Sequence, residues 1–149
     1  MTNQTYLEVN VYAPNGLIFS NQASFVTADT PSGEIGILPH HISLVTPIDT
    51  GAVKVTLNKK NQEDKEAYIA VNGGIMEVHN NTVNIVASFA IRARDIDEAD
   101  VRLEMQKAES EMETALMKKD TAAYTRARIE LKHAINQIDV KTAKLKNQK

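Results

Sequence analysis

The chain changes character near residue 90, because from Arg92 to Lys149 it contains neither glycine nor proline. Ala, Glu, Lys, Arg, Leu and Met dominate this segment, and they are the strong helix formers. Glycine and proline are confined to the earlier part, where they separate short runs rich in β-branched residues. The sequence therefore predicts an α+β protein with a β domain over 1–90 and a helical domain over 91–149.

The first part has the spacing of an antiparallel β protein. The stretch TYLEVNVYA alternates along its length and ends at PNG, as expected for a strand and a tight reversal. Further runs are separated by TPSG, PIDTG, the charged run at 59–66, NGG and NN. We expect Gly73 and Gly74 to form a hairpin turn and the charged run to be a solvated loop. Eight or more short strands predict a sandwich or flattened barrel.

Two amphipathic helices are predicted in the second part. Asp95 and Glu98 have the spacing of a capping box at the start of the first helix, and Asp120 suits the N-cap of the second. The apolar stripes expected on these helices are Val101, Met105, Ala108, Met112 and Leu116, and Tyr124, Ala127, Leu131, Ala134, Ile135 and Ile138.

The two helices should pair as an antiparallel hairpin, because only a short loop separates them. Alanines and methionines in the stripe of the first helix make a thin seam, which buries less apolar area than a leucine-rich one. At about 25 cal/mol per Å², the deficit amounts to a few kcal/mol. We therefore expect a detachable hairpin.

Composition excludes several classes of protein. The chain has no cysteine, which removes disulfides, thiolate nucleophiles and cysteine-type zinc sites. No stretch is apolar enough to span a bilayer, and the first residues do not resemble a signal peptide, so no direct membrane insertion is expected. A net charge of −2 argues against general nucleic-acid binding. The segment from Arg126 onward is locally cationic, which favours an acidic protein surface as partner.

The sequence offers little chemistry. Adjacent His40 and His41 on an extended segment would point to opposite faces, and His79 and His133 lie on other elements, so no metal site is expected. There is no GxSxG motif and no phosphate-binding glycine pattern. Neither catalysis nor a cofactor is predicted.

Three ordered stretches carry a family resemblance: APNGLIFS, then TPSGEIGILPHHISLVTPIDTGAVKV, then AYIAVNGGIMEVHNNTVNIVASFAIRARDID. With the two helices that follow, they resemble the epsilon subunits of bacterial F-type ATP synthases over nearly the whole chain. The resemblance implies a β-sandwich of about ten strands followed by a helical hairpin. It also implies a non-catalytic rotor subunit, peripheral on the cytoplasmic face of the bacterial membrane, in a complex that couples proton transport to ATP synthesis.

The resemblance also implies partners and contact residues. The sandwich would bind the gamma subunit, and its rim would face the c-ring of the rotor. The rim residues at the matching positions are Glu34, Ile37, Leu38, Pro39, His40 and His41. His40 departs from the family, which usually carries glycine at this position.

A second implied role is inhibition of ATP hydrolysis, with the hairpin extended along gamma toward the alpha and beta subunits. Arg126, Arg128 and Lys132 would then meet an acidic segment of beta. The alternative is that these three residues are only the solvated face of a helix.

Some members of the family bind ATP in the folded hairpin, and this role is the alternative function. The family motif I-D-x-x-R-A is here Ile96 to Val101, so Asp97 keeps the acid while Asp100 replaces the arginine. His133 and Gln137 stand where sensor-type members carry arginines. A carboxylate where a triphosphate needs a cation weakens affinity, although Arg102 or Lys107 would offset part of the loss. The resemblance therefore implies weak or absent ATP binding.

Overall fold

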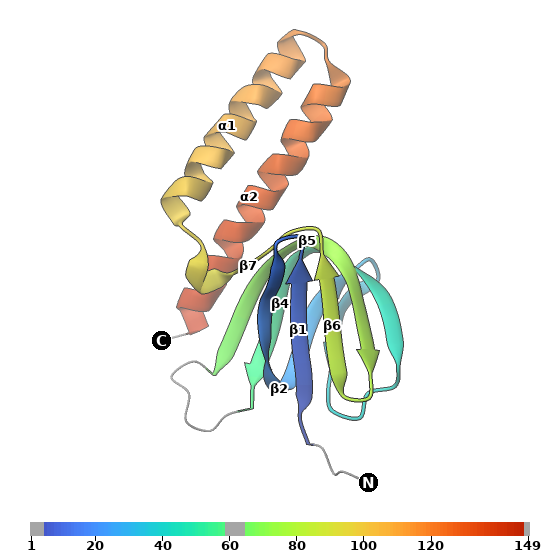
Figure 1. Cartoon of the computed structure of the whole chain (residues 1–149). Coiled ribbons are helices and arrows are strands. Elements are labelled where there is room, and N and C mark those ends of the chain that lie inside the picture. The colour runs from blue at the N-terminus through green and yellow to red at the C-terminus, as the bar shows by residue number, and fades with distance from the viewer. Residues whose placement is uncertain (1–4, 59–64, 148–149) are drawn as a thin grey trace.

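The computed structural model describes residues 5–58 and 65–147 and shows a β body with a helical hairpin on one side (Figure 1). Residues 59–64, which form most of the charged run predicted as a solvated loop, lie outside the described residues. The elements are β1 (Leu7–Ala13), β2 (Gly16–Thr30), β3 (Gly33–Ile37), β4 (Leu44–Leu57), β5 (Glu66–His79), β6 (Thr82–Ala87), β7 (Ala90–Arg92), the 3-10 helix η1 (Ala93–Asp95), α1 (Glu98–Met117) and α2 (Thr121–Asn147).

The strands form one seven-stranded sheet that closes on itself. Its order is β1-β6-β5-β4-β2-β3, β7 pairs with β5, and β1 also pairs with β2, which completes a ring. The pair β1–β6 is parallel, whereas the other pairs are antiparallel. Alternate side chains of every strand fill the ring with a core of aliphatic residues that includes Leu7, Val26, Ile69, Met76 and Ile85. This closed body is the flattened-barrel form of the predicted class.

The prediction of about ten strands is wrong, because three strands are longer than the sequence pattern indicates. β2 has 15 residues, and β4 and β5 have 14 each. The sequence pattern predicts that PIDTG and NGG separate neighbouring strands, but these segments lie inside β4 and β5. Gly73 and Gly74 therefore form no hairpin turn; at φ 93° and 157°, they let β5 bend while it stays paired with β4 on one side and reaches β6 on the other.

The helices begin and end close to the predicted residues, with one correction at the first cap. Asp97, and not Asp95, is the N-cap of α1, and its carboxylate accepts hydrogen bonds from the backbone N–H groups of Ala99 and Asp100. Asp95 lies in η1. Asp120 caps α2 as predicted, since its carboxylate accepts a hydrogen bond of 3.1 Å from Ala123 N–H.

Alanines at seven-residue intervals are buried on both paired helices: Ala108 and Ala115 on α1, and Ala127 and Ala134 on α2. The predicted stripes are wrong at Leu116 and Ile135, which are 63% and 40% exposed. Where two helices pack side by side, the residues at the contact recur about every 3.5 residues, so equivalent positions are seven residues apart.

The C-terminal half of α2, the short segment around η1 and Val101 near the start of α1 dock the hairpin on the β body, while the loop end of the hairpin projects away (Figure 1). The buried residues of this contact include three alanines: Tyr68, Ala70, Ala93, Ile96, Val101, Ala134 and Val140. The partly buried residues that pack against them are Ala52, Ile91, Met105, Ile138 and Ala143. Within the described residues, neither helix is long and apolar enough to cross a membrane.

Candidate functional site

Of the rim residues, Leu38 to His41 form a turn after β3, whereas Glu34 and Ile37 lie in β3 itself. Ile37 is fully buried in the core, whereas the next residue, Leu38, is 59% exposed. His41 N–H donates to the carbonyl of Leu38 at 3.2 Å, which closes the turn. Ile37 therefore anchors the turn and presents no side chain at the rim, while Glu34 and His40 are exposed and Pro39 and His41 are half-buried.

His40 adopts the left-handed backbone conformation, with φ 68°. The extended geometry predicted for His40 and His41 is therefore wrong at this residue. Only glycine adopts this conformation without steric cost, which gives a physical reason for the glycine that the family usually carries. The backbone N–H of His40 donates to Asn81 Oδ1 at 2.6 Å, so a second turn holds the strained residue in place.

His79 ties the two rim turns together from the end of β5. Its Nδ1 lies 3.0 Å from Ser43 Oγ, and its Nε2 lies 3.0 Å from the side-chain nitrogen of Asn80. These contacts use both ring nitrogens for local structure. Among residues 5–58 and 65–147, no three His, Cys, Asp or Glu side chains are grouped to hold a metal ion.

An exposed apolar row crosses the outer face of the sheet, and the sequence reasoning missed it. The row consists of directly paired neighbours on five strands, β2, β1, β6, β5 and β4: Leu17, Tyr12, Val86, Ile75 and Pro47. Leu17, Val86 and Ile75 are each more than half exposed. Val45, the next outward residue of β4, is 70% exposed and extends the row.

A polar row borders the apolar row along the same strands. Ser20 Oγ donates to Asn10 Oδ1 at 2.7 Å, and Asn10 donates through its side-chain nitrogen to Asn84 Oδ1 at 3.1 Å. The outer face thus changes from apolar to polar within two or three residues along β1, β2 and β6. Consecutive apolar pairs such as Ile75–Met76 and Ile85–Val86 were the sequence signal for this surface, since strict alternation would place a polar residue outside.

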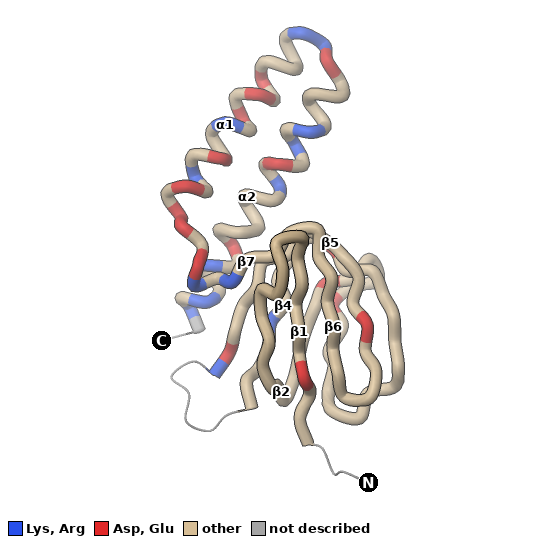
Figure 2. The backbone as a smooth tube through the Cα atoms, in the orientation of Figure 1, with Lys and Arg blue, Asp and Glu red and all other residues tan. Residues whose placement is uncertain are grey.

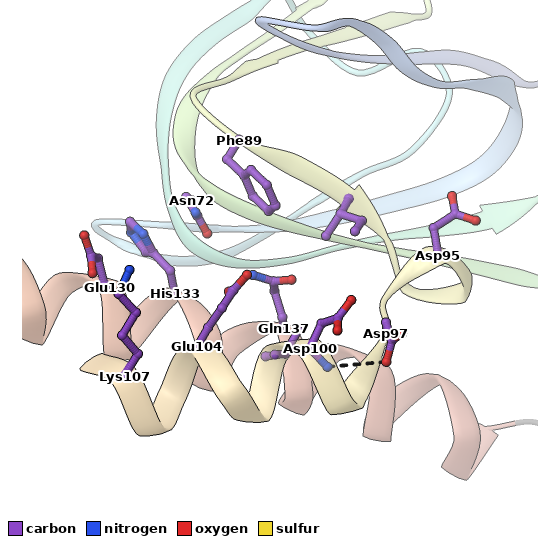
Figure 3. A pocket seen from close by; sticks show the side chains of 12 residues that line it. Asn72, Phe89, Asp95, Asp97, Asp100, Glu104, Lys107, Glu130, His133 and Gln137 are labelled. Atoms are coloured by element: carbon purple, nitrogen blue, oxygen red, sulfur yellow. Dashed lines mark hydrogen bonds between the residues drawn. The ribbon is translucent and has the colours of Figure 1, made fainter. Parts of the chain in front are cut away.

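A pocket of about 620 Å³ lies where the hairpin meets the β body (Figure 3). Asn72 of β5 and Phe89, in the loop before β7, point into it from the sheet side. Around its helical side lie Asp97, Asp100, Glu104 and Lys107, together with Glu130, His133 and Gln137 of α2. The structure therefore brings together all four predicted nucleotide-sensor positions, Asp97, Asp100, His133 and Gln137.

The electrostatics of this pocket are acidic. Asp95, Asp97, Asp100, Glu104 and Glu130 line it, and among the described residues Lys107 is the one Lys or Arg in the lining. Partial burial first, and then the charge of Lys132, lower the pKa of His133, although Glu130 acts in the opposite direction. This lowered pKa favours the neutral form of His133. Arg102 is not available either, because it forms an ion pair of 2.6 Å with Glu98.

The three predicted cationic contact residues of α2 are exposed but do not share one face. Arg128 and Lys132 are one helical turn apart, whereas Arg126 lies on the side that borders the groove between the helices. None of the three forms an ion pair with a residue in the described part of the chain. Acidic residues gather on α1 and basic residues on α2 (Figure 2).

Comparisons with known proteins agree with this arrangement. Residues 6–93 match the family model described as ATP synthase, Delta/Epsilon chain, beta-sandwich domain. The chain is 37% identical over 138 residues to the ATP synthase epsilon chain of Latilactobacillus sakei subsp. sakei (strain 23K), which covers 93% of this chain and 94% of that relative.

The fold also resembles a chain in the cryo-EM structure of the Euglena gracilis mitochondrial ATP synthase, OSCP/F1/c-ring in rotational state 1. The TM-score is 0.73 at 18% sequence identity, over 93% of this chain and 83% of that chain. At this identity the likeness concerns the fold alone. It covers both the β body and the hairpin.

Proposed function

The chain belongs to the ATP synthase delta/epsilon family and is, as an epsilon chain, a non-catalytic subunit of that complex; from this premise we propose that it joins the gamma subunit to the c-ring in a bacterial F-type rotor. In this role it transmits torque during proton-driven ATP synthesis. It is peripheral, on the cytoplasmic face of the cell membrane. The domain division at residue 90 separates a coupling body from a regulatory hairpin.

The observation that carries this proposal is the exposed apolar row. Soluble proteins seldom expose a continuous apolar strip except where a partner covers it, and here five neighbouring strands contribute one residue each. The row lies on a closed sheet with a filled aliphatic core, which is a stiff support. We assign the row and Val45 to the gamma-binding face of the body.

The rim turn is the proposed c-ring contact. Glu34, Leu38, His40 and His41 present exposed or half-exposed side chains, while Ile37 and Pro39 hold the backbone that carries them. The hydrogen bonds between His40 and Asn81 and between Ser43 and His79 join this turn to its neighbour. Two tied turns give a defined surface for the polar loops of a rotor ring.

The hairpin is the proposed inhibitor of ATP hydrolysis. Its contact with the β body is narrow and rich in alanine, so release exposes little apolar area. Arg128 and Lys132, one turn apart and without an ion-pair partner in the described part of the chain, are the pair best placed to meet an acidic segment of beta. Arg126 contributes from the adjacent face.

The alternative role, an ATP sensor, is less well supported. Asp97, Asp100, His133 and Gln137 line one pocket, but its described lining carries five carboxylates and one ammonium group. A triphosphate in this field would meet repulsion in place of charge-assisted hydrogen bonds. We therefore propose that ATP binds with millimolar affinity or weaker.

Binding to a purified gamma subunit tests the main proposal. Replacing both Val86 and Ile75 by serine removes two apolar side chains, each worth about 1.5–3 kcal/mol when fully buried, so the dissociation constant should rise at least about tenfold. Leu103→Ser, at an exposed position of α1, is the control and should change it less than about twofold. No binding by the unaltered chain, or equal loss in both variants, would contradict the proposal.

A further inference from the structure

The residues that line the pocket between the hairpin and the β body indicate the chemistry of a ligand that would fit it. Its carboxylates come from three separate places: Asp95 in η1, Asp97, Asp100 and Glu104 at the start of α1, and Glu130 on α2. Asp97 uses one oxygen to cap α1. Within the described residues, the other carboxylates take part in no ion pair, apart from the surface contact of Asp95 with Arg94 at 3.9 Å.

Two amide side chains in the same pocket lack hydrogen-bond partners. Gln137 is 7% exposed, so its side chain is more than nine-tenths buried, and it makes no hydrogen bond to any described residue. Asn72 Oδ1 is buried and also unpartnered within the described part of the chain. Both point into the pocket (Figure 3). A buried polar group without a partner destabilises the structure, and a bound donor removes that cost.

Phe89 adds an aromatic surface to the same pocket. Its side chain is 37% exposed and points toward the carboxylates from the sheet side (Figure 3). The face of an aromatic ring attracts ammonium groups. Carboxylates, an aromatic ring and unpaired amide oxygens together form a recognition set for ammonium groups, because each supplies negative charge or an acceptor for N–H donors.

The distribution of the carboxylates selects among cations. In residues 5–58 and 65–147, no three candidate ligands lie close enough together to hold a metal ion, which requires donors within about 2–2.6 Å of one point. The acids are instead spread around about 620 Å³, a volume in the range of small-molecule sites. We propose that this pocket binds a linear polyamine, whose separated ammonium groups match separated carboxylates.

Such a ligand would fasten the hairpin to the β body. Asn72 and Phe89 belong to the β body, Glu104 to α1 and Gln137 to α2, so one polyamine contacts all three parts. A ligand that binds only the docked form stabilises that form by mass action. This inference goes beyond the proposed coupling and inhibitory roles and does not depend on them, because it is tested on the chain alone.

Isothermal titration of the full chain with spermidine, at an ionic strength of about 0.15 M, is the test. We expect saturable binding with one site per chain. Replacing Asp100 by Asn together with Glu104 by Gln should weaken it at least about tenfold. The matched control is Glu109→Gln with Glu113→Gln, which removes the same charge from exposed positions of α1 outside the pocket and should change affinity less than about twofold.

A second variant separates specific recognition from general attraction. Phe89→Leu keeps an apolar side chain but removes the aromatic face, and it should weaken spermidine binding about threefold or more. The proposal is overturned if spermidine shows no saturable binding, or if the control pair weakens it as much as the pocket pair. It is also overturned if magnesium chloride at equal ionic strength binds with the same dependence on Asp100 and Glu104.

Discussion

The side-chain nitrogen of Asn136 on α2 lies 3.0 Å from the backbone carbonyl oxygen of Gly51 on β4. The same nitrogen lies 3.4 Å from the carbonyl oxygen of Val71 on β5. The ammonium group of Lys141 donates to the carbonyl of Ile96 nearby. The hairpin is thus held by a few polar contacts beside a small apolar cluster, and this combination is suited to release.

Asn136→Ala should weaken docking of the hairpin by about 1–3 kcal/mol, because it leaves the carbonyl groups of Gly51 and Val71 without this donor. The native chain has no cysteine, so dyes can be attached at Asn15→Cys and Lys118→Cys. Energy transfer between them should report a detached fraction raised about tenfold. Gln106→Ala, on the exposed side of α1, should leave the fraction unchanged. An unchanged detached fraction in Asn136→Ala would show that the hydrogen bonds of Asn136 contribute little to the free energy of docking.

His40→Gly should stabilise the β body by about 0.5–1 kcal/mol. The left-handed conformation of His40 at φ 68° costs a side-chain-bearing residue about 1–2 kcal/mol, and the greater freedom of glycine in the unfolded chain offsets part of the gain. The midpoint of urea unfolding measures the change. His41→Gly is the neighbouring control. It should destabilise the β body, because His41 has no positive φ whose strain a glycine would relieve. Equal destabilisation by both variants would refute the argument.

Gly74→Ala should destabilise the sheet by several kcal/mol. A Cβ at this position would overlap the carbonyl oxygen of Val86 and lie 2.8 Å from Ala87 Cα, and backbone atoms of a paired strand cannot move aside cheaply. Gly16→Ala serves as a comparison, because it has a positive φ of 118° but no atom within 4 Å of the new Cβ. Gly16→Ala should therefore lower the free energy of unfolding by about 1–2 kcal/mol, from backbone strain alone. Equal losses of unfolding free energy would contradict the steric argument.

Much of this fold was predictable because local signals agreed with the tertiary structure. The turn at Pro14 and Asn15, the cap at Asp120 and the absence of glycine and proline after Arg92 each led to the observed element. The number of strands was not predictable in this way. Gly73 and Gly74 have the local chemistry of a turn, but pairing with two neighbouring strands keeps them inside β5.

The candidate site was predictable only in part. The resemblance selected Asp97, Asp100, His133 and Gln137, and the structure places all four in one pocket. The contributions of Asn72 and Phe89 could not be foreseen, since they depend on how the hairpin packs on the sheet. The apolar row also required the register, because Tyr12, Val86 and Ile75 become neighbours only when three strands pair.

Restoring positive charge to the pocket should create nucleotide affinity. The unaltered chain should bind ATP with millimolar affinity or weaker, whereas Asp100→Arg combined with Gln137→Arg should tighten binding at least about tenfold through charge-assisted hydrogen bonds. Glu109→Arg combined with Glu113→Arg supplies the same number of arginines outside the pocket and should have little effect. Isothermal titration measures all three proteins. Micromolar binding by the unaltered chain would overturn the electrostatic argument.

Cross-linking in the assembled ATP synthase tests the central claim most directly. A single cysteine at Ile75→Cys, in the apolar row, should form a cross-link to the gamma subunit when a short bifunctional reagent is added. Lys65→Cys, just before β5, should form no such cross-link. It lies ten residues from Ile75 along the chain, which corresponds to about 33 Å in an extended strand. A cross-link to gamma from Ile75→Cys alone is the predicted result. Absence of any such cross-link in an assembled, active complex would contradict the assignment of this face to the rotor shaft.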